Sequence, residues 1–241
     1  MKIKDFLREK LSYDSMLVTP VNQVLRNIPI VNFVKKIKKA NKNLKILEVG
    51  SGAAGITKFI KTPVTGIDIQ FYGKPSPYLK QLKHSAIEKF PFRDNEFDIV
   101  ISTDCYEHLP KRKRRKTLEE MYRVSKKYIV FTTIFGLHKW HKKILDKWEK
   151  TGTISKGIHD IKIKGSPDIN EIYSFLSKKG NHTLRTEYGT HPRLAYYLNL
   201  VDKNIITRLL SRTVLKLFVP AFKLYKGKHR IYFFITKTAK N

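Results

Sequence analysis

The sequence contains one cysteine, Cys105, and 20 acidic residues against 49 lysines and arginines. A single cysteine excludes an internal disulfide and a structural zinc site built on cysteines, and we predict no metal site. The chain also lacks a run of the roughly 20 uncharged apolar residues that a membrane-spanning helix needs. Its first residues lack the unbroken apolar core of a secretory signal peptide. We therefore expect a cytoplasmic protein.

The shortage of acids leaves a formal net charge of +29 at pH 7. Such an excess attracts polyanions: nucleic acid, an anionic membrane face, and phosphorylated glycans or lipids. A simpler explanation is that lysine fills ordinary surface positions, and the net charge does not separate the two. The chain has 241 residues, of which 41% are hydrophobic. We expect one good core, and so a single domain with additions.

The order of hydrophobic segments divides the chain near residue 44. Residues 1–43 are basic and predict a helical N-terminal extension, with breaks at Pro20 and near Pro29. From Lys45 onward, predicted strands alternate with predicted helices, which favours a parallel sheet. The predicted strands are 45–49, 64–69, 97–102, 128–133 and 230–237. The predicted helices are one between the glycines at 50–55 and Pro63, a short piece at 78–83, and helices at 113–125 and 167–176.

A glycine-rich turn follows the first predicted strand. Gly50, Gly52 and Gly55 form the pattern G-x-G-x-x-G, and Glu48 lies two residues before the first glycine. Glycines let the backbone turn tightly and come close to a ligand, and the free N–H groups of the following helix face that ligand. The turn therefore predicts a nucleotide-type pocket. A carboxylate at a strand end beside glycines is costly without a partner, so Glu48 is a candidate pocket residue.

An acid at the end of the second predicted strand supports this pocket. Asp68 follows the glycine turn by about 20 residues, the distance at which an acid can accept hydrogen bonds from both hydroxyls of a bound ribose. A carboxylate suits this task because it accepts two hydrogen bonds from neighbouring donors. The turn and the acid together also fit a nicotinamide-dependent dehydrogenase. These two features leave both classes of enzyme open.

The residues around the strand at 97–102 separate the two classes. They read Phe-Pro-Phe-Arg-Asp-Asn-Glu-Phe-Asp-Ile-Val-Ile-Ser at 90–102 and Cys-Tyr-Glu-His-Leu-Pro at 105–110. Here the chain resembles the class I S-adenosylmethionine (SAM)-dependent methyltransferases, especially the methyltransferase type 11-like branch. The resemblance covers about residues 44–135 and implies a methyltransferase domain at 44–241. It also implies a Rossmann-like, doubly wound α/β fold with a mostly parallel seven-stranded sheet and an antiparallel last strand.

The resemblance assigns cofactor-binding roles to individual positions. In the family the glycine motif wraps the methionine part of SAM, an acid binds the ribose, and apolar residues pack on the adenine. The tip of the strand at 97–102 borders the sulfonium. The matching positions here are Glu48, Gly50, Ser51, Gly52, Asp68, Ile69, Ile87, Ser102 and Thr103. Many relatives carry an Asp just before the position of Ile87, where this chain has Ser85 and Ala86, so Ser85 or the backbone would take that contact.

The implied reaction is an in-line displacement at the methyl group of SAM by an oxygen or nitrogen acceptor. Such an acceptor can need a base within hydrogen-bond reach. Candidates are Asp104, His108 and His159, the last in a polar loop where this branch often carries an acid–histidine pair. A histidine without a role is an equal alternative for His159. We expect Cys105 to be a buried, inert thiol.

The class of methyl acceptor is inferred from the basic regions of the chain. Residues 111–116 form a basic run, and 136–228 contain a predicted basic helical insertion or lid. Within it, residues 194–225 predict an amphipathic helix, either packed on the domain with its cations in water or in contact with an anionic membrane at its cytoplasmic face. This favours a glycan, a lipid-linked molecule or another anionic acceptor near a membrane. An RNA or DNA methyltransferase is the less favoured alternative, and a non-catalytic SAM-binding or nucleic-acid-binding protein is the third.

Overall fold

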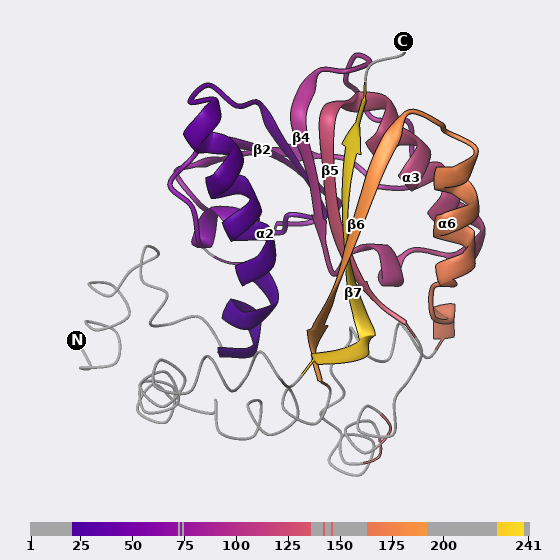
Figure 1. The fold of residues 1–241 in the computed structure, drawn as a ribbon. Coiled ribbons are helices and arrows are strands. Elements are labelled where there is room, and N and C mark those ends of the chain that lie inside the picture. Colours follow the sequence, from indigo (N-terminus) through magenta and orange to yellow (C-terminus); the bar gives the residue numbers. More distant parts are fainter. Residues whose placement is uncertain are drawn as a thin grey trace, which may run out of the picture.

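A computed structural model of the chain describes residues 21–71, 73, 75–135, 142, 146, 163–191 and 226–238. These residues form a seven-stranded sheet with helices on both faces (Figure 1). The candidate base His159, the segment 194–225 and most of the insertion at 136–228 lie outside the described residues.

The sheet has the strand order β3-β2-β1-β4-β5-β7-β6. The strands that run parallel to one another are β1 (Ile46–Val49), β2 (Val64–Asp68), β3 (Leu79–Lys83), β4 (Phe97–Thr103) and β5 (Ser125–Ile134). β7 (Lys226–Lys237) runs antiparallel to both β5 and β6 (His182–Thr190). The predicted fold class is confirmed, including the antiparallel last strand.

Helices cover the sheet on two sides (Figure 1). On one side, Ile30 and Val34 of α2 (Val21–Ala40) pack in a cluster with sheet residues such as Ile99. On the other side, α3 (Lys111–Val124) and α6 (Ile169–Ser177) contribute Met121 and Phe175 to a second cluster. Strands covered on both faces are apolar almost throughout, because neither face meets water.

α2 differs from the prediction because it continues through Pro29. A proline inside a helix removes a backbone hydrogen bond and costs about 3 kcal/mol. Here the residues that follow it, Ile30, Val31 and Val34, are buried against the sheet. Their burial offsets that cost, so the predicted break near Pro29 is wrong.

Three further segments differ from the sequence-based expectation. Residues 79–83 form the edge strand β3 and not a helix; only Leu79 among them is buried, so the pattern carried little strand signal. The helix after the glycines is a single 3-10 turn, η1 (Gly55–Lys58). β6 was not predicted, because its alternation of half-buried and exposed residues is irregular. The predicted helices at 113–125 and 167–176 are confirmed as α3 and α6.

The strand order reverses between β1 and β4, because the chain passes from β1 to β2 on one side while β4 lies on the other. Open α/β sheets bind ligands in the crevice at the carboxyl ends of the strands on either side of such a reversal. The glycine turn follows Val49 at the end of β1, and Asp104 follows Thr103 at the end of β4. The fold therefore places both segments at the crevice.

Arg123 of α3 fixes the loop that leads into β4. Its guanidinium donates to the Glu120 carboxylate at 2.6 and 2.9 Å and to the Asp94 carboxylate at 2.7 Å. It also donates to the carbonyl oxygens of Phe92 at 2.8 Å and Phe90 at 3.1 Å. The hydrogen bond from Arg123 is the main cause that lowers the pKa of Glu120. Arg123 thus links the helix to three positions of the loop.

We predict that Arg123→Gln lowers the free energy of unfolding by about 2 kcal/mol, since hydrogen bonds to charged groups contribute roughly 1.5–3 kcal/mol. Arg115→Gln is the matched control, because the Arg115–Glu119 pair on the same helix has exposed side chains (60% and 44%). That change should cost less than about 1 kcal/mol. Urea denaturation of the three proteins measures both, and equal losses would contradict the assignment.

Candidate active site

The glycine turn requires glycine at two positions, because a Cβ at each would clash with a different side chain. Gly50 has a φ of +75°, and a Cβ there would lie 2.5 Å from Cβ of Cys105. Gly55 has a φ of +47°, and a Cβ there would lie 1.9 Å from a carboxylate oxygen of Glu48. Both values of φ lie in the left-handed region that side chains disfavour. Glycine at these two positions therefore lets the backbone of the turn lie against the ends of β1 and β4.

Glu48 lies beneath the turn. Its side chain is almost fully buried, and its two oxygens accept hydrogen bonds from the N–H of Ile56 at 3.0 and 2.8 Å. Burial raises the pKa of Glu48 to about 8, although the Ile56 hydrogen bond and the charge of Lys58 oppose the shift. Glu48 therefore satisfies a free N–H at the start of η1, which fixes the turn from below. Its contact with a cofactor stays a prediction.

Asp68 lies on the neighbouring strand tip and holds the turn from the side. Its carboxylate accepts hydrogen bonds from the N–H of Gly52 at 2.8 Å and from the N–H of Gln70 at 3.1 Å. The residue is only half-buried, and the next residue, Ile69, is 63% exposed. An accessible carboxylate beside an exposed apolar side chain suits a ribose and the base attached to it.

The remaining predicted cofactor residues lie around this pair of strand ends. Ser51 is buried, and its hydroxyl donates to the carbonyl of Gly52 at 3.1 Å. Ser102 is also buried, and its hydroxyl donates to the carbonyl of Val49 at 3.1 Å, which joins the ends of β4 and β1. Thr103 ends β4. Ile87 is half-buried and packs against one of the two core clusters.

The three candidate bases have different surroundings. Both carboxylate oxygens of Asp104, which has a φ of +52°, are held by guanidinium groups, one from Arg26 and one from Arg230. This engagement favours a structural role for Asp104 over a role as base. His108 lies in η2 (Tyr106–His108), where its backbone carbonyl accepts from Lys164 Nζ at 2.9 Å. His159 lies outside the described residues.

Cys105 is the residue beneath Gly50. Burial is the main cause that raises the pKa of its thiol to about 12, and the nearby carboxylates of Glu107 and Asp68 add to the shift. A thiol with this pKa stays protonated at neutral pH and is a poor nucleophile. The protonated state agrees with the predicted inert thiol, although Cys105 is half-buried and not fully buried as expected. No cluster of three or more His, Cys, Asp or Glu side chains suited to a metal occurs within the described part of the chain.

Sequence reasoning missed four residues at this edge of the sheet. Arg26 and Arg230 come from α2 and β7, and nothing local links them to Asp104. Arg114 is fully buried inside the basic run and donates to the carbonyls of Glu107 at 3.1 Å and Gly165 at 2.5 Å. Glu107 is fully buried as well. A signal existed for Arg114, because it shares one helix face with Leu118 and Met121 at spacings of four and seven.

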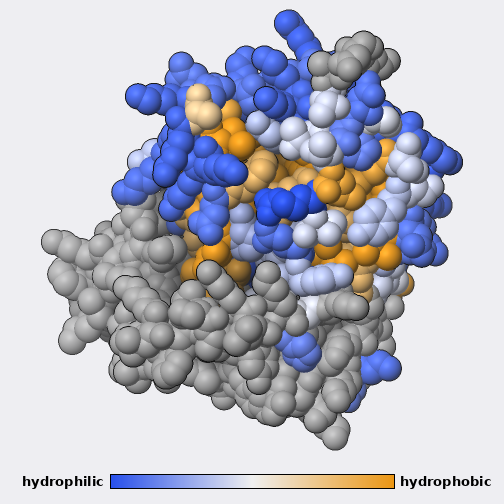
Figure 2. Space-filling view, viewed as in Figure 1, coloured by the Kyte–Doolittle hydropathy of each residue, from blue (hydrophilic) through white to orange (hydrophobic). Residues whose placement is uncertain are grey.

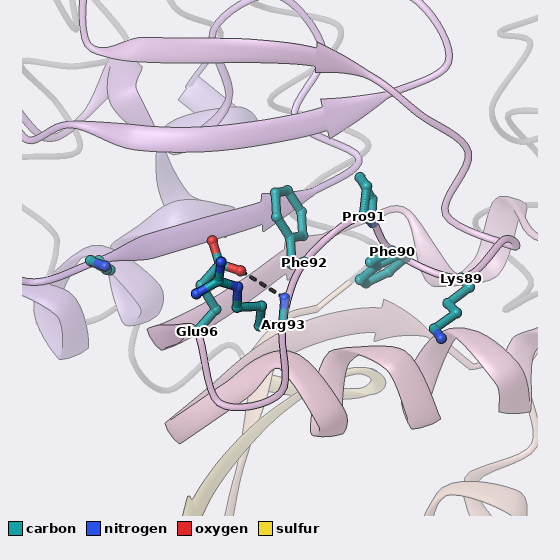
Figure 3. Close-up of a pocket in the computed structure, with 7 residues that line it drawn as sticks. Lys89, Phe90, Pro91, Phe92, Arg93 and Glu96 are labelled. Carbon is teal, nitrogen blue, oxygen red and sulfur yellow. Dashed lines mark hydrogen bonds between the residues drawn. The ribbon is translucent and has the colours of Figure 1, made fainter.

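Two cavities lie away from the glycine turn. One of about 640 Å³ is lined by Lys45, residues 89–93 and Glu96, at the amino ends of β1 and β4. Figure 3 shows the Glu96 carboxylate beside the backbone N–H of Arg93, from which it accepts a hydrogen bond of 2.7 Å. The strands begin there, so this cavity lies at the edge opposite the crevice. The second, of about 710 Å³, lies between α3 and α6.

Comparison with known proteins identifies a domain in this chain. Residues 47–131 match the family model described as a methyltransferase domain. The chain carries a class I SAM-dependent methyltransferase domain. No curated protein matches the sequence.

Solved structures share the fold of this methyltransferase domain. A putative methyltransferase from an antibiotic biosynthesis pathway of Anabaena variabilis has a TM-score of 0.52 and 14% identity, with 87% of this chain and 97% of that chain covered. A SAM-dependent methyltransferase from Archaeoglobus fulgidus has a TM-score of 0.52 and 16% identity, with 88% and 94% covered.

A phosphoethanolamine N-methyltransferase from Haemonchus contortus was solved with phosphomonomethylethanolamine and S-adenosylhomocysteine. It has a TM-score of 0.53 and 17% identity; the match covers 100% of this chain and 61% of that chain.

The cofactor of the methyltransferase domain is SAM, and the residues present fit it. The left-handed turn at Gly50 and Gly52 presents backbone without side chains, and Asp68 and Ile69 lie accessible at the adjacent strand tip. We expect the methionine part at the turn, the ribose at Asp68 and the adenine at Ile69.

The raised pKa of Glu48 predicts a pH dependence of stability. Its pKa is about 8 in the folded protein against an ordinary value of 4.5, so the folded state binds this proton more tightly. The free energy of unfolding should therefore fall as the pH rises from about 5 to about 8. Each pKa unit corresponds to about 1.4 kcal/mol, so the loss amounts to a few kcal/mol.

Glu48→Gln keeps the shape of the side chain without a proton to lose, so this variant should lack that part of the pH dependence. Urea denaturation of both proteins across this pH range measures the difference. A difference between the two that does not change with pH would show that Glu48 is ionised in the folded domain.

Proposed function

We propose that the domain transfers the methyl group of SAM to an oxygen or nitrogen of an anionic acceptor. A glycan or a lipid-linked molecule near a membrane surface is the class we favour. The observation that carries this proposal is a groove of about 710 Å³ lined from α3 by Lys111, Arg112 and Arg115. It lies between α3 and α6 and is also lined by Tyr106 of η2, the turn that follows β4.

In the proposed reaction, the residues of this chain serve to align the reacting groups. When bound, SAM provides a methyl group on a positively charged sulfur, which is already a good electrophile. The Ser102–Val49 hydrogen bond fixes the end of β4 against the end of β1, and the Asp68–Gly52 hydrogen bond fixes the turn between β1 and β2. A large part of a displacement barrier can be removed by holding the reacting groups in line. These contacts supply the rigid frame for that alignment.

The charges of the groove favour an anion. The wall from α6 carries two acids, Asp168 and Glu171, and Asp168 also caps its own helix by accepting from the N–H of Asn170 at 2.9 Å. The wall from α3 carries exposed cations, and the start of α6 adds the positive end of a helix dipole. A phosphate or carboxylate therefore gains more from this groove than a neutral acceptor.

Two further features support an anionic acceptor. The chain carries a net charge of +29, and in the described part of the face in Figure 2 hydrophilic side chains surround a central band of hydrophobic ones. The Haemonchus contortus enzyme shows that this fold can bind a phosphate ester beside S-adenosylhomocysteine. The predicted membrane contact at 194–225 belongs to the same proposal. Within the described residues, no helix is long and apolar enough to cross a membrane.

The test is transfer of labelled methyl from SAM into a fractionated cell extract, scored as lipid, glycan, nucleic acid or protein. We predict label in the lipid or glycan fraction, and label that elutes from an anion-exchange column as an acidic product. Label confined to RNA or DNA would favour the nucleic-acid methyltransferase. Absence of both transfer and SAM binding would leave the non-catalytic alternative.

The groove has its own prediction. Lys111→Glu with Arg112→Glu should reduce methyl transfer to the acidic acceptor about tenfold or more, because two attractive charges become repulsive. Binding of S-adenosylhomocysteine should be unchanged. The control is Lys126→Glu with Lys127→Glu, since these exposed lysines begin β5 at the opposite edge of the sheet. Equal losses in the two variants would attribute the effect to net charge and contradict a role for the groove.

A further inference from the structure

Several buried polar atoms lie at the carboxyl ends of β4 and β5 without a hydrogen-bond partner in the described part of the chain. They are Thr103 Oγ1, Thr132 Oγ1, Glu107 Oε1 and Arg26 Nε. Buried polar atoms are paired in almost all native proteins, so several unpaired ones at one end of the sheet need an explanation. A binding site for a polar molecule is one.

These atoms lie at one end of the sheet but on its two faces, because consecutive residues of a strand point to opposite sides. Thr132 faces the side covered by α2, and Thr133, with Glu107, faces the side covered by α3. Thr103 and Thr132 are direct partners in the register between β4 and β5. Glu107 follows in η2, and its Oε2 accepts a hydrogen bond of 2.9 Å from the hydroxyl of Thr133, the residue after Thr132. Arg26 lies on the α2 side of this end of the sheet, where it pairs with Asp104. The Glu107 carboxyl group is therefore held by one oxygen, and the other is buried without a hydrogen-bond partner among the described residues.

The surroundings of Glu107 place its pKa near neutral pH, so both the protonated and the ionised form of the side chain are populated. Burial raises the pKa of Glu107 to about 7, while the Thr133 hydrogen bond and the charges of Arg26 and Arg114 hold the shift back. Cys105, beside it in sequence, is a neutral thiol. A carboxyl group in these surroundings can accept a proton and release it at neutral pH, which is the property a general base needs.

We propose that Glu107 binds the methyl acceptor and receives its proton. This rests on the proposed function. The acceptor O–H or N–H donates a hydrogen bond to Glu107 Oε1. As the acceptor atom forms a bond to the methyl carbon, the bond from that carbon to sulfur breaks and its electron pair stays on sulfur. The acceptor proton passes to Glu107, so a neutral carboxylic acid and S-adenosylhomocysteine remain.

The neighbouring groups are less suited to this task. Both oxygens of Asp104 are engaged by Arg26 and Arg230. The thiol of Cys105 is held protonated. Thr103 and Thr132 have hydroxyls that can orient an acceptor but cannot take its proton at neutral pH. Glu107 is thus the described acid at this edge with both an oxygen that lacks a hydrogen-bond partner among the described residues and a suitable pKa.

The test is Glu107→Gln, which keeps an oxygen for the Thr133 hydroxyl but cannot take a proton. Transfer of labelled methyl into the extract acceptor should fall about 100-fold or more, the usual contribution of a general base. Binding of S-adenosylhomocysteine, measured by calorimetry, should stay the same. Glu88→Gln, a change in an exposed side chain, is the control and should leave both unchanged.

The pH profile separates chemistry from structure. With saturating SAM, the wild-type rate should rise with pH through a midpoint near 7 and then level off, because only the carboxylate form of Glu107 accepts a proton. The residual rate of Glu107→Gln should lack this rise. A variant that transfers at the wild-type rate, or one that loses S-adenosylhomocysteine binding along with transfer, would overturn the proposal. A wild-type protein that binds the cofactor but labels nothing would overturn the proposed function and this inference with it.

Discussion

The hydrogen bond from the N–H of Ile56 to the carboxylate of Glu48 is the contact on which the crevice depends. It places a buried acid directly beneath Gly55, in the space that a Cβ would otherwise fill. Asp68 holds the same turn at Gly52 from the neighbouring strand. Two carboxylates on adjacent strands therefore fix a turn that must present bare backbone to a ligand. One of them is buried and serves the turn, and the other remains accessible and can also serve the ligand.

The far side of the crevice is built differently. Asp104 joins α2, β4 and β7 by pairing with Arg26 and Arg230, which lie 78 and 126 residues away in sequence. Arg230 is buried, and burial together with the charge of Arg26 lowers its pKa to about 9. The domain thus separates its two tasks. The predicted contacts with the methionine part and the ribose come from the ends of β1 and β2, and the proposed contacts with the acceptor come from β4, β5 and the helices beside them.

The features that could be predicted from the sequence are those whose signal lies within a few neighbouring residues. The apolar run at Ile46–Val49, the glycines and Asp68 each carry their signal within a few residues, so the strands and the turn could be placed. β3 was missed because an edge strand with one buried residue has no clear pattern. The ion pairs of Asp104 with Arg26 and Arg230 were missed because the three residues come from separate parts of the chain. In a sequence rich in lysine and arginine, neither arginine stands out. Glu107 was missed because its burial depends on packing against β5.

The sharpest test of the SAM pocket is equilibrium binding of S-adenosylhomocysteine, measured by calorimetry on the wild-type protein and on Asp68→Asn. The account predicts one binding site per chain, and binding at least about tenfold weaker in the variant, a loss of about 1.4 kcal/mol from the weakened ribose contact. Equal affinities in the two proteins, or no binding by the wild type, would contradict it.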